Sequence, residues 1–552
     1  MQEGNFSKFT VVVAVLMVSA AATIPYLSTV HGYFLGEDFG LVQLFSNRPI
    51  LHFLHLFIRP YDENIWGDPT DELRAFAALY YTLGTLGGAN SPDLQHIITI
   101  TFHVLTSLLV LVTARSVACI SWIASVFAAV LFAVLPIHAE TVSWITGRVD
   151  SSMALFYTAS FLAYAHWRRT RMIAILMLSV AAYFVALYNK ESAITLPATL
   201  FLYDRLIARR NVRLSWGELQ PYLPYALLTG AMLTLRYVLF DNFVHANGLF
   251  TFGIVWRYLP MQVRLVEELL FGSVFVTLAS PLSVLIPSLV IGLCIGVFVA
   301  IKTIRLLQRP TTQSIRNCQL YVLFFGPGWW LICTAPLLVA GPSLRYLYLP
   351  AIGIAIALGL VFDMLQRMQY QYWRYFTMAG AAALVMLTLW GLRFRVQEWN
   401  IAAMVSDKVQ SALEREAVAA PEGVLLIVDA PDFGGTSKRP TRLWASAIPF
   451  TVQPPFMKSD LSNRLIVVCP FLIYATLPNL WFEDMQRLLW RADERRLPIV
   501  VMRWDSRSGD LTRRTNVDMS DLPSRVLELA NAKSPKAMTE RMNALLNAIP
   551  QR

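Results

Sequence analysis

Charged residues are scarce in this chain of 552 residues. Only 15% are Asp, Glu, Lys or Arg, whereas 56% are hydrophobic, and the mean hydropathy is +0.50. Typical soluble domains contain about 25% charged residues, so the composition excludes an ordinary soluble protein. It predicts a polytopic α-helical membrane protein instead.

The chain also lacks the cysteine spacing of a zinc site or a disulfide framework. Its five cysteines lie mostly inside apolar runs and form no spaced pairs: Cys119, Cys294, Cys318, Cys333 and Cys469. We interpret them as small hydrophobic residues. The first apolar run follows Lys8 without a small-residue cleavage site, which favours a retained first helix over a signal peptide.

The formal net charge of +10 does not indicate nucleic-acid binding, because the basic residues stand in short clusters between apolar runs. One cluster begins at Arg168, and another extends from Lys302 to Arg309. Such clusters mark cytoplasmic loops. We expect an integral protein of a bacterial cytoplasmic (inner) membrane, with a cytoplasmic N-terminus and no nucleic-acid partner.

A membrane-spanning helix needs roughly 17–25 residues, and we count about eleven apolar runs as candidates. Their approximate bounds are 9–30, 97–114, 120–135, 153–167, 173–187, 193–207, 221–240, 285–301, 320–339, 347–364 and 376–392. An odd number of spans places the C-terminus outside. We therefore predict a membrane domain over residues 1–393.

Two outer loops are too long for plain connections between helices. The first, residues 32–95, mixes aromatic and charged residues with helix-compatible stretches, which predicts helices lying in the membrane interface. The second, residues 251–287, either lies flat or re-enters the bilayer.

Residues 394–552 are richer in charge, Pro and turn residues and are predicted to form an extracytoplasmic soluble α/β domain. Three β-rich runs begin at residues 423, 464 and 497, and the residues between the last two fit a helix. We expect a strand–helix–strand unit with a parallel pair, and a terminal helix that begins at Ser534 and Pro535. The domain has no Gly-rich phosphate loop and no recognisable catalytic triad.

An acidic pair, Glu37 and Asp38, follows the first apolar run directly. Carboxylates beside a membrane bundle are costly and are usually functional. Gly36 and Gly40 bracket the pair and allow a tight turn with close approach of a substrate. The alternative interpretation is a solvated loop with ordinary charges.

Six more polar side chains occur in the next outer loops: His138, Glu140, Arg148, Asp150, Lys190 and Glu191. One interpretation is a network of salt bridges that caps the helices. The other is a site for an anionic ligand, in which Arg148 binds a phosphate and His138 relays a proton. For Lys190 and Glu191, the structural alternative is a simple ion pair at a helix end.

Taken in order, these segments resemble the successive signatures of GT-C glycosyltransferases. The resemblance covers most of Gly32 to Leu360 and is closest to the protein O-mannosyltransferase-like branch, whose members often carry tetratricopeptide repeats. Its elements include GEDFG, H-x-E followed by W-I-x-G-R-x-D, NKES and R-Y-L-Y-L-P. The chain departs from the branch twice: Ala75 follows Arg74 where a proline is usual, and an α/β domain replaces the repeats.

The resemblance implies transfer of a sugar from a polyprenyl-phosphate donor to an acceptor at the extracytoplasmic face, usually with inversion, and it implies that the acidic pair is catalytic. Asp38 is our candidate for the base that removes the acceptor hydroxyl proton, and Glu37 for the residue that orients the acceptor. The acceptor is a protein, a glycan or a lipid. Membrane lipids surround the enzyme, and a partner protein could bind the C-terminal domain.

Positive charge is needed where the phosphate leaving group develops its negative charge. Arg148, Lys190 and Arg345 are candidates, and Arg345 is best placed because it begins a helix at the outer face. The predicted substrate-binding residues are Arg74, His138, Glu140, Arg148, Asp150, Lys190, Glu191, Arg345 and Tyr348, although Tyr348 taken singly also fits an interfacial aromatic. A divalent cation could bind through Glu37, Asp38 or His138, but no ligand spacing identifies one.

Three other functions fit the sequence less well. A transporter or flippase of lipid-linked sugars would need polar or broken helices near the bilayer midplane and usually internal repeats, which we do not find. A scaffold needs one span as its anchor rather than about eleven. A ligase or polymerase of lipid-linked glycans also uses outer-face His and Arg, but the acidic pair after the first helix argues against it. The identities of the sugar and the acceptor depend on cavity shape and stay open.

Overall fold

In the computed structural model, the chain is mostly helical and divides into two compact units. The first consists of Met1–Leu27, Asp71–Ala77 and Ile97–Val396, and the second of Ser28–Thr70, Ala78–His96 and Gln397–Arg552. The structure describes residues 8–66, 70–208, 216–243, 269, 313–337, 343–368, 371–421, 423–431, 433–434, 441–468, 479–513 and 522–548.

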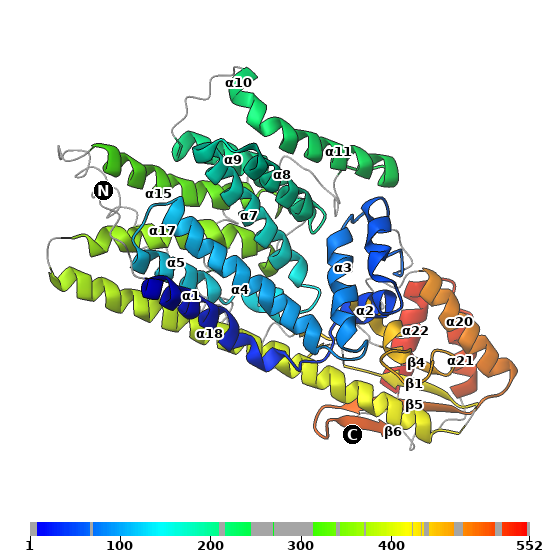
Figure 1. Ribbon diagram of the computed structural model, residues 1–552. Coiled ribbons are helices and arrows are strands. Elements are labelled where there is room, and N and C mark those ends of the chain that lie inside the picture. The colour runs from blue at the N-terminus through cyan, green and yellow to red at the C-terminus, as the bar shows by residue number, and fades with distance from the viewer. Residues whose placement is uncertain are drawn as a thin grey trace. The chain divides into compact units, whose positions relative to one another are not determined.

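The first unit is a bundle of helices (Figure 1). Its elements, some of which extend into the second unit, are α1 (Lys8–Thr23), η1 (Ile24–Thr29), α4 (Asp93–Ser116), α5 (Trp122–Ala133), α6 (His138–Ser143), α7 (Arg148–Thr170), α8 (Ile173–Leu187), η4 (Glu191–Thr195), α9 (Leu196–Leu206), α10 (Trp216–Leu219), η5 (Gln220–Tyr222), α11 (Leu223–Phe240), α15 (Gln313–Thr334), η6 (Leu344–Leu347), α17 (Tyr348–Gln366) and α18 (Gln371–Ala419).

Helices long and apolar enough to cross a membrane confirm the predicted membrane class. Among the described residues there are five: Lys8–Thr29, Asp93–Ser116, Trp216–Phe240, Leu344–Gln366 and Gln371–Ala419. Two further apolar helices, α5 and α8, are shorter. The predicted span 285–301 and the predicted loop 251–287 lie outside the described residues, so the count of about eleven spans stays a prediction.

Local sequence features explain why α5 is shorter than its predicted span. The Oγ of Ser121 accepts a hydrogen bond from the backbone N–H of Ala124 at 3.4 Å, which caps the start of α5. Pro136 follows its last turn and cannot donate a backbone hydrogen bond. The helix therefore covers 12 residues of the predicted span 120–135.

Polar groups lie inside the bundle, and apolar side chains lie on its surface. Arg168 pairs with Asp204, which also accepts a hydrogen bond from the Tyr164 hydroxyl at 2.6 Å, and all three are buried. In contrast, Ile173 and Met177 of α8 are 65% and 66% exposed. Exposed apolar surface with paired interior charges is the arrangement expected of helices in lipid.

The first outer loop is helical, as predicted. It contains α2 (Asp38–Ser46), η2 (Ile50–Phe57), α3 (Ala75–Gly84) and η3 (Thr85–Gly87). Leu51 and Leu54 of η2 are 65% and 52% exposed. An exposed apolar face is typical of a helix in the membrane interface, and that location stays a prediction.

A four-stranded sheet forms the predicted α/β fold in the second unit, with the order β4-β1-β5-β6. Its strands are β1 (Leu425–Asp429), β4 (Leu465–Val468), β5 (Ile499–Asp505) and β6 (Asp510–Arg513). The three predicted strands are confirmed, but the last two are not neighbours, because β1 pairs in parallel with both β4 and β5. Strand β6, which is antiparallel to β5, was not predicted. Neither was the two-stranded sheet of β2 (Phe433–Gly434) and β3 (Thr441–Arg442).

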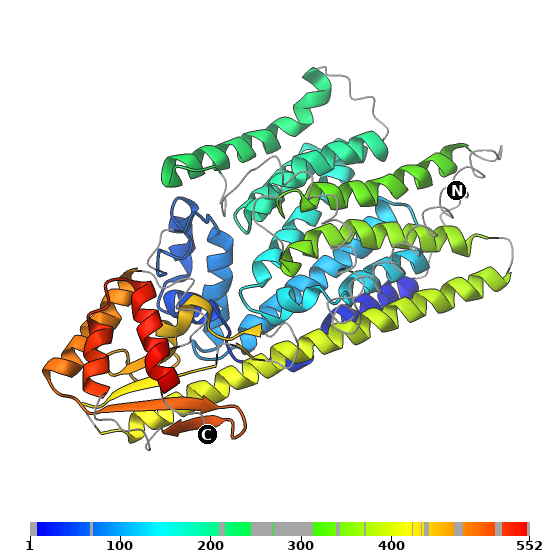
Figure 2. The same cartoon turned by 180° about the vertical axis from the view of Figure 1, so that it is seen from behind.

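Three helices cover one face of this sheet: α20 (Asn479–Glu494), α21 (Leu522–Ala530) and α22 (Pro535–Ala548). Figure 2 shows them from behind, in orange and red. Ile427 of β1, Leu489 of α20 and Met542 of α22 are fully buried in a common core. The Oγ of Ser534 accepts a hydrogen bond from the Ala537 N–H at 3.2 Å, which confirms the predicted start of the terminal helix.

Helix α18 continues past Arg393, where the composition changes, and ends only at Ala419. Pro421 and Gly423 follow it, and Gly423 has a positive φ of 82°, which favours a helix end. In the second unit, Arg464 donates to the carbonyls of Ala417 and Ala420 at 3.0 Å each. The division into domains at residue 393 stays a prediction.

Candidate active site

The acidic pair stands at the start of α2 in the second unit. Gly36 has a positive φ of 57°, a conformation that glycine adopts without strain, and Asp38 is the first residue of the helix. One oxygen of Asp38, Oδ2, accepts a hydrogen bond from the Leu35 N–H at 3.1 Å. Asp38 is 1% exposed and Glu37 is half-buried, which excludes an ordinary solvated loop for Asp38.

Residues from the far end of the sequence pack around this helix within the same unit. The carbonyl of Leu443 accepts a hydrogen bond from the Gly36 N–H at 2.7 Å. The ring of Phe39 lies 5.7 Å from the Trp444 ring and 4.8 Å from the Phe456 ring, between centroids. A Cβ on Gly40 would approach the Trp66 ring to 2.5 Å, so α2 packs too closely for any larger residue there.

A separate cavity of about 370 Å³ lies within the first unit. Its walls are mostly apolar, with residues such as Met153, Leu187, Met232, Leu233, Pro336 and Leu349. Its charged lining residues are Glu72, Arg74, Asp150, Lys190, Glu191 and Arg236. Four of these, Arg74, Asp150, Lys190 and Glu191, belong to the predicted substrate-binding residues.

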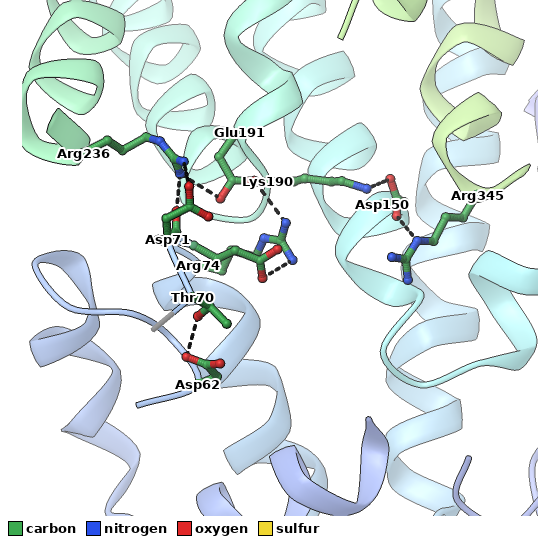
Figure 3. A network of polar contacts seen from close by, with 10 residues as sticks. Asp62, Thr70, Asp71, Arg74, Asp150, Lys190, Glu191, Arg236 and Arg345 are labelled. Atoms are coloured by element: carbon green, nitrogen blue, oxygen red, sulfur yellow. Dashed lines mark hydrogen bonds and ion pairs between the residues drawn. The ribbon is translucent and has the colours of Figure 1, made fainter. Parts of the chain in front are cut away.

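Ion pairs connect the charged residues on one side of this cavity (Figure 3). Arg74, just before α3, contacts Glu72 at 2.7 Å and Glu191 at 3.1 Å. Arg236, in α11, contacts Asp71 at 3.1 Å and lies 3.6 Å from Glu191. Glu191 therefore bridges two arginines from different segments.

A second group of contacts centres on Asp150, in the first turn of α7. Lys190 donates to its Oδ1, and the Nε of Arg345 lies 4.0 Å from its Oδ2. The ammonium of Lys190 stands 3.9 Å from the centre of the Tyr346 ring, and the Arg345 guanidinium stands 5.0 Å from that of the Trp144 ring. The aromatic rings favour both cations at these places.

Lys190 and Glu191 are adjacent in sequence but take different partners, so they do not form the simple ion pair at a helix end. Burial lowers the pKa of Lys190 to about 8, although Asp150 opposes this shift. Burial also acts to raise the pKa of Glu191, but Arg74 and Arg236 outweigh it and hold that pKa below its usual value. Glu191 is therefore an anion at neutral pH.

The remaining predicted residues of this unit do not line the cavity. His138 is fully buried, with its ring 4.4 Å from the Tyr348 ring, and burial lowers its pKa well below the usual value. The Tyr348 hydroxyl is 2.7 Å from Nδ1 of His103. Arg148 is fully buried at the start of α7, and Glu140 accepts a hydrogen bond from Ser343 at 3.4 Å. Their roles stay predictions.

Sequence reasoning missed Asp71, Glu72 and Arg236. The sequence does contain a signal for Arg236, because this residue is a single cation inside the predicted span 221–240. Such charges usually face the interior of a bundle. Arg236 is 2% exposed. Among the described residues, no three His, Cys, Asp or Glu side chains cluster as a metal site would require, and metal dependence stays open.

The comparison with known sequences finds protein O-mannosyl-transferases, and no family model matches the chain. Protein O-mannosyl-transferase Tmtc1 of Drosophila melanogaster is 28% identical over 205 residues, which are 35% of this chain and 23% of the relative. TMTC3 of Mus musculus is 26% identical over 38% of this chain and 23% of its own length. F38B6.6 of Caenorhabditis elegans is 21% identical over 63% and 51%. The matches thus span about a quarter to a half of these relatives, and their names confirm the resemblance that the motifs indicate.

Solved structures also resemble this chain. ArnT from Cupriavidus metallidurans bound to undecaprenyl phosphate is 12% identical, with a TM-score of 0.46 over 91% of this chain and 94% of that one. The oligosaccharyltransferase of Archaeoglobus fulgidus is 14% identical, with a TM-score of 0.42 over 76% and 60%. Both TM-scores are below 0.5, so neither likeness supports a conclusion about the site.

Proposed function

We propose that this relative of the protein O-mannosyl-transferases is a membrane glycosyltransferase that moves a sugar from a polyprenyl-phosphate donor to an acceptor hydroxyl. The observation that carries this proposal is the cavity of about 370 Å³, in which an apolar wall meets Arg74, Lys190 and Arg236. A lipid phosphate has the matching chemistry, an apolar chain with an anionic head. We place the reaction at the extracytoplasmic face of a bacterial cytoplasmic membrane.

The proposed transfer assigns a role to each group. The acceptor oxygen attacks the anomeric carbon as the bond from that carbon to the phosphate oxygen breaks, and the configuration inverts. Asp38 takes the proton of the acceptor hydroxyl. Polyprenyl phosphate leaves with an additional negative charge, which Arg74, Lys190 and Arg236 stabilise. Asp150 holds Lys190 and Arg345 in place by charge.

A transfer assay tests this function directly. The full chain, in nanodiscs, receives radiolabelled polyprenyl-phosphate mannose with a protein, a glycan or a lipid acceptor, with and without a chelator. We expect labelled acceptor and released polyprenyl phosphate from at least one acceptor class. Movement of the donor across the bilayer without transfer would identify a flippase, and failure to bind undecaprenyl phosphate would reject both.

Phosphate binding should weaken as the pH rises through about 8. Burial lowers the pKa of Lys190 to that value, so its ammonium is present below pH 8 and lost above it, whereas an exposed lysine keeps its charge to about pH 10. Loss of one charge-assisted hydrogen bond costs about 1.5–3 kcal/mol, or roughly tenfold or more in affinity. The measurement is the Kd for undecaprenyl phosphate between about pH 7 and 10.

A Lys190→Arg variant is the control for this pH dependence, because a guanidinium stays protonated over the whole range. Its Kd should change little between the same pH limits. An equal loss of affinity in the variant and the wild-type chain would show that another group causes it.

A further inference from the structure

Each cation that lines the cavity already has a carboxylate of its own. Arg74 pairs with Glu72 at 2.7 Å, Arg236 with Asp71 at 3.1 Å, and Lys190 with Asp150. Glu191 is a fourth carboxylate, additional to these pairs. It contributes a negative charge between two arginines whose positive charges are already compensated.

Glu191 is held more loosely than Asp71 and Asp150. Its Oε2 accepts a hydrogen bond from Arg74 at 3.1 Å. Its Oε1 is buried without a hydrogen-bond partner among the described residues and lies 3.6 Å from Nη1 of Arg236. In contrast, Arg236 donates to both the carbonyl and the carboxylate of Asp71. The Glu191 side chain is also 29% exposed, compared with 9% for Asp71 and 3% for Asp150, whereas Glu72 is 24% exposed.

We propose that Glu191 is a built-in competitor of the phosphate: it bridges Arg74 and Arg236, and the phosphate of the lipid displaces it. This inference rests on the proposed function. A phosphate monoester offers three terminal oxygens and can contact both guanidinium groups, each of which presents paired N–H donors. Glu191 occupies this place with two oxygens and one charge. Figure 3 shows its carboxylate between the two arginines.

Such a competitor acts most strongly on the product. The donor is a phosphodiester with one negative charge, whereas the released lipid phosphate is a monoester that carries about −1.5 to −2 at neutral pH. Without Glu191, the dianion would take the bridging position between Arg74 and Arg236 unopposed by a third carboxylate and would bind more tightly. The return of Glu191 to the arginines weakens product binding and so favours release, which limits turnover in many enzymes.

The experiment measures the Kd for undecaprenyl phosphate and the turnover of the full chain. Glu191→Gln should bind undecaprenyl phosphate about tenfold more tightly, equivalent to about 1.4 kcal/mol, and should turn over more slowly at saturating donor. Glu191→Asp keeps the charge but is too short to bridge both arginines. Its Kd for undecaprenyl phosphate should therefore lie between the Kd of the wild-type chain and that of Glu191→Gln. If Glu191→Gln does not fold, the Glu191→Asp variant still decides the question.

Glu72→Gln is the matched control, because it removes the same charge from the same cavity wall at a residue that pairs with Arg74 and, among the described residues, does not bridge Arg74 to Arg236. Its affinity should rise by less than about threefold, as expected of a general change in charge. Equal tightening in Glu72→Gln and Glu191→Gln would overturn the bridging role. Unchanged affinity in both Glu191 variants would overturn it as well. Failure of the wild-type chain to bind undecaprenyl phosphate would instead reject the proposed function.

Discussion

Replacing Asp38 with Asn should lower the rate of sugar transfer by about 10²–10⁴-fold, the usual contribution of a general base. Asn has nearly the same shape, and its amide oxygen can still accept the hydrogen bond from the Leu35 N–H, which is 3.1 Å long in the native chain. The first turn of α2 should therefore persist. The measurement is the transfer rate with polyprenyl-phosphate mannose, together with the Kd for undecaprenyl phosphate, which should not change.

Glu37→Gln provides the comparison within the same pair. Glu37 is only half-buried, and its proposed role is to orient the acceptor, so its loss should reduce transfer by less than about tenfold. Wild-type activity in Asp38→Asn would reject Asp38 as the base. A larger loss in Glu37→Gln than in Asp38→Asn would reverse the two assignments.

Local patterns in the sequence predicted the position of the acidic pair but not its surroundings. Charge next to an apolar run identified Asp38, and Gly36 has the positive φ of a tight turn. Gly40 was predicted to allow close approach of a substrate, but in the structure the Trp66 ring lies beside it instead. Leu443 and Trp444 pack on the same helix from about 400 positions further along the chain. Contacts between such distant residues leave no period or spacing in a single sequence.

The cavity was only partly predictable for a similar reason. Lys190 and Glu191 are neighbours in sequence, and an ion pair between them was a reasonable alternative. In the structure, Lys190 pairs with Asp150 instead, and Glu191 contacts Arg74 and Arg236. The two side chains take different partners because they leave the backbone in different directions. The order of the strands was unpredictable for the same kind of reason. Each strand has its own hydrophobic pattern, but the pairing of β1 with both β4 and β5 depends on how the connections between the strands cross the sheet.

Replacing Trp444 with Ala should lower kcat by about 10²-fold, the loss that a 1 Å displacement of a catalytic group can cause, and should leave the KM for the donor unchanged. Trp444 is 1% exposed. Its indole N–H donates to the Pro431 carbonyl at 2.8 Å, and its ring contacts Phe39, the residue after Asp38. We therefore propose Trp444 as a positioning residue for the acidic pair.

Trp444→Phe separates positioning from general destabilisation. Trp→Ala in a core costs about 3–5 kcal/mol, which could unfold the second unit. Phe keeps a ring against Phe39 and leaves one partly buried carbonyl without its partner, at a cost of at most about 1–3 kcal/mol. Phe should thus restore most of kcat. Trp490→Ala is the control, because Trp490 is 40% exposed on α20, and its kcat and thermal midpoint should match the wild-type values.

A positioning role for Trp444 requires that kcat falls while the KM for the donor stays unchanged. The residues proposed to bind the donor phosphate, Arg74, Lys190 and Arg236, belong to the first unit, whereas Trp444 and Asp38 belong to the second. A displaced base slows the chemical step and leaves donor binding intact. Equal loss of donor affinity and kcat in folded Trp444→Ala would contradict a positioning role. A deletion after Trp399 cannot replace this variant, since it would remove Leu443, Trp444 and Phe456 together and expose Phe39.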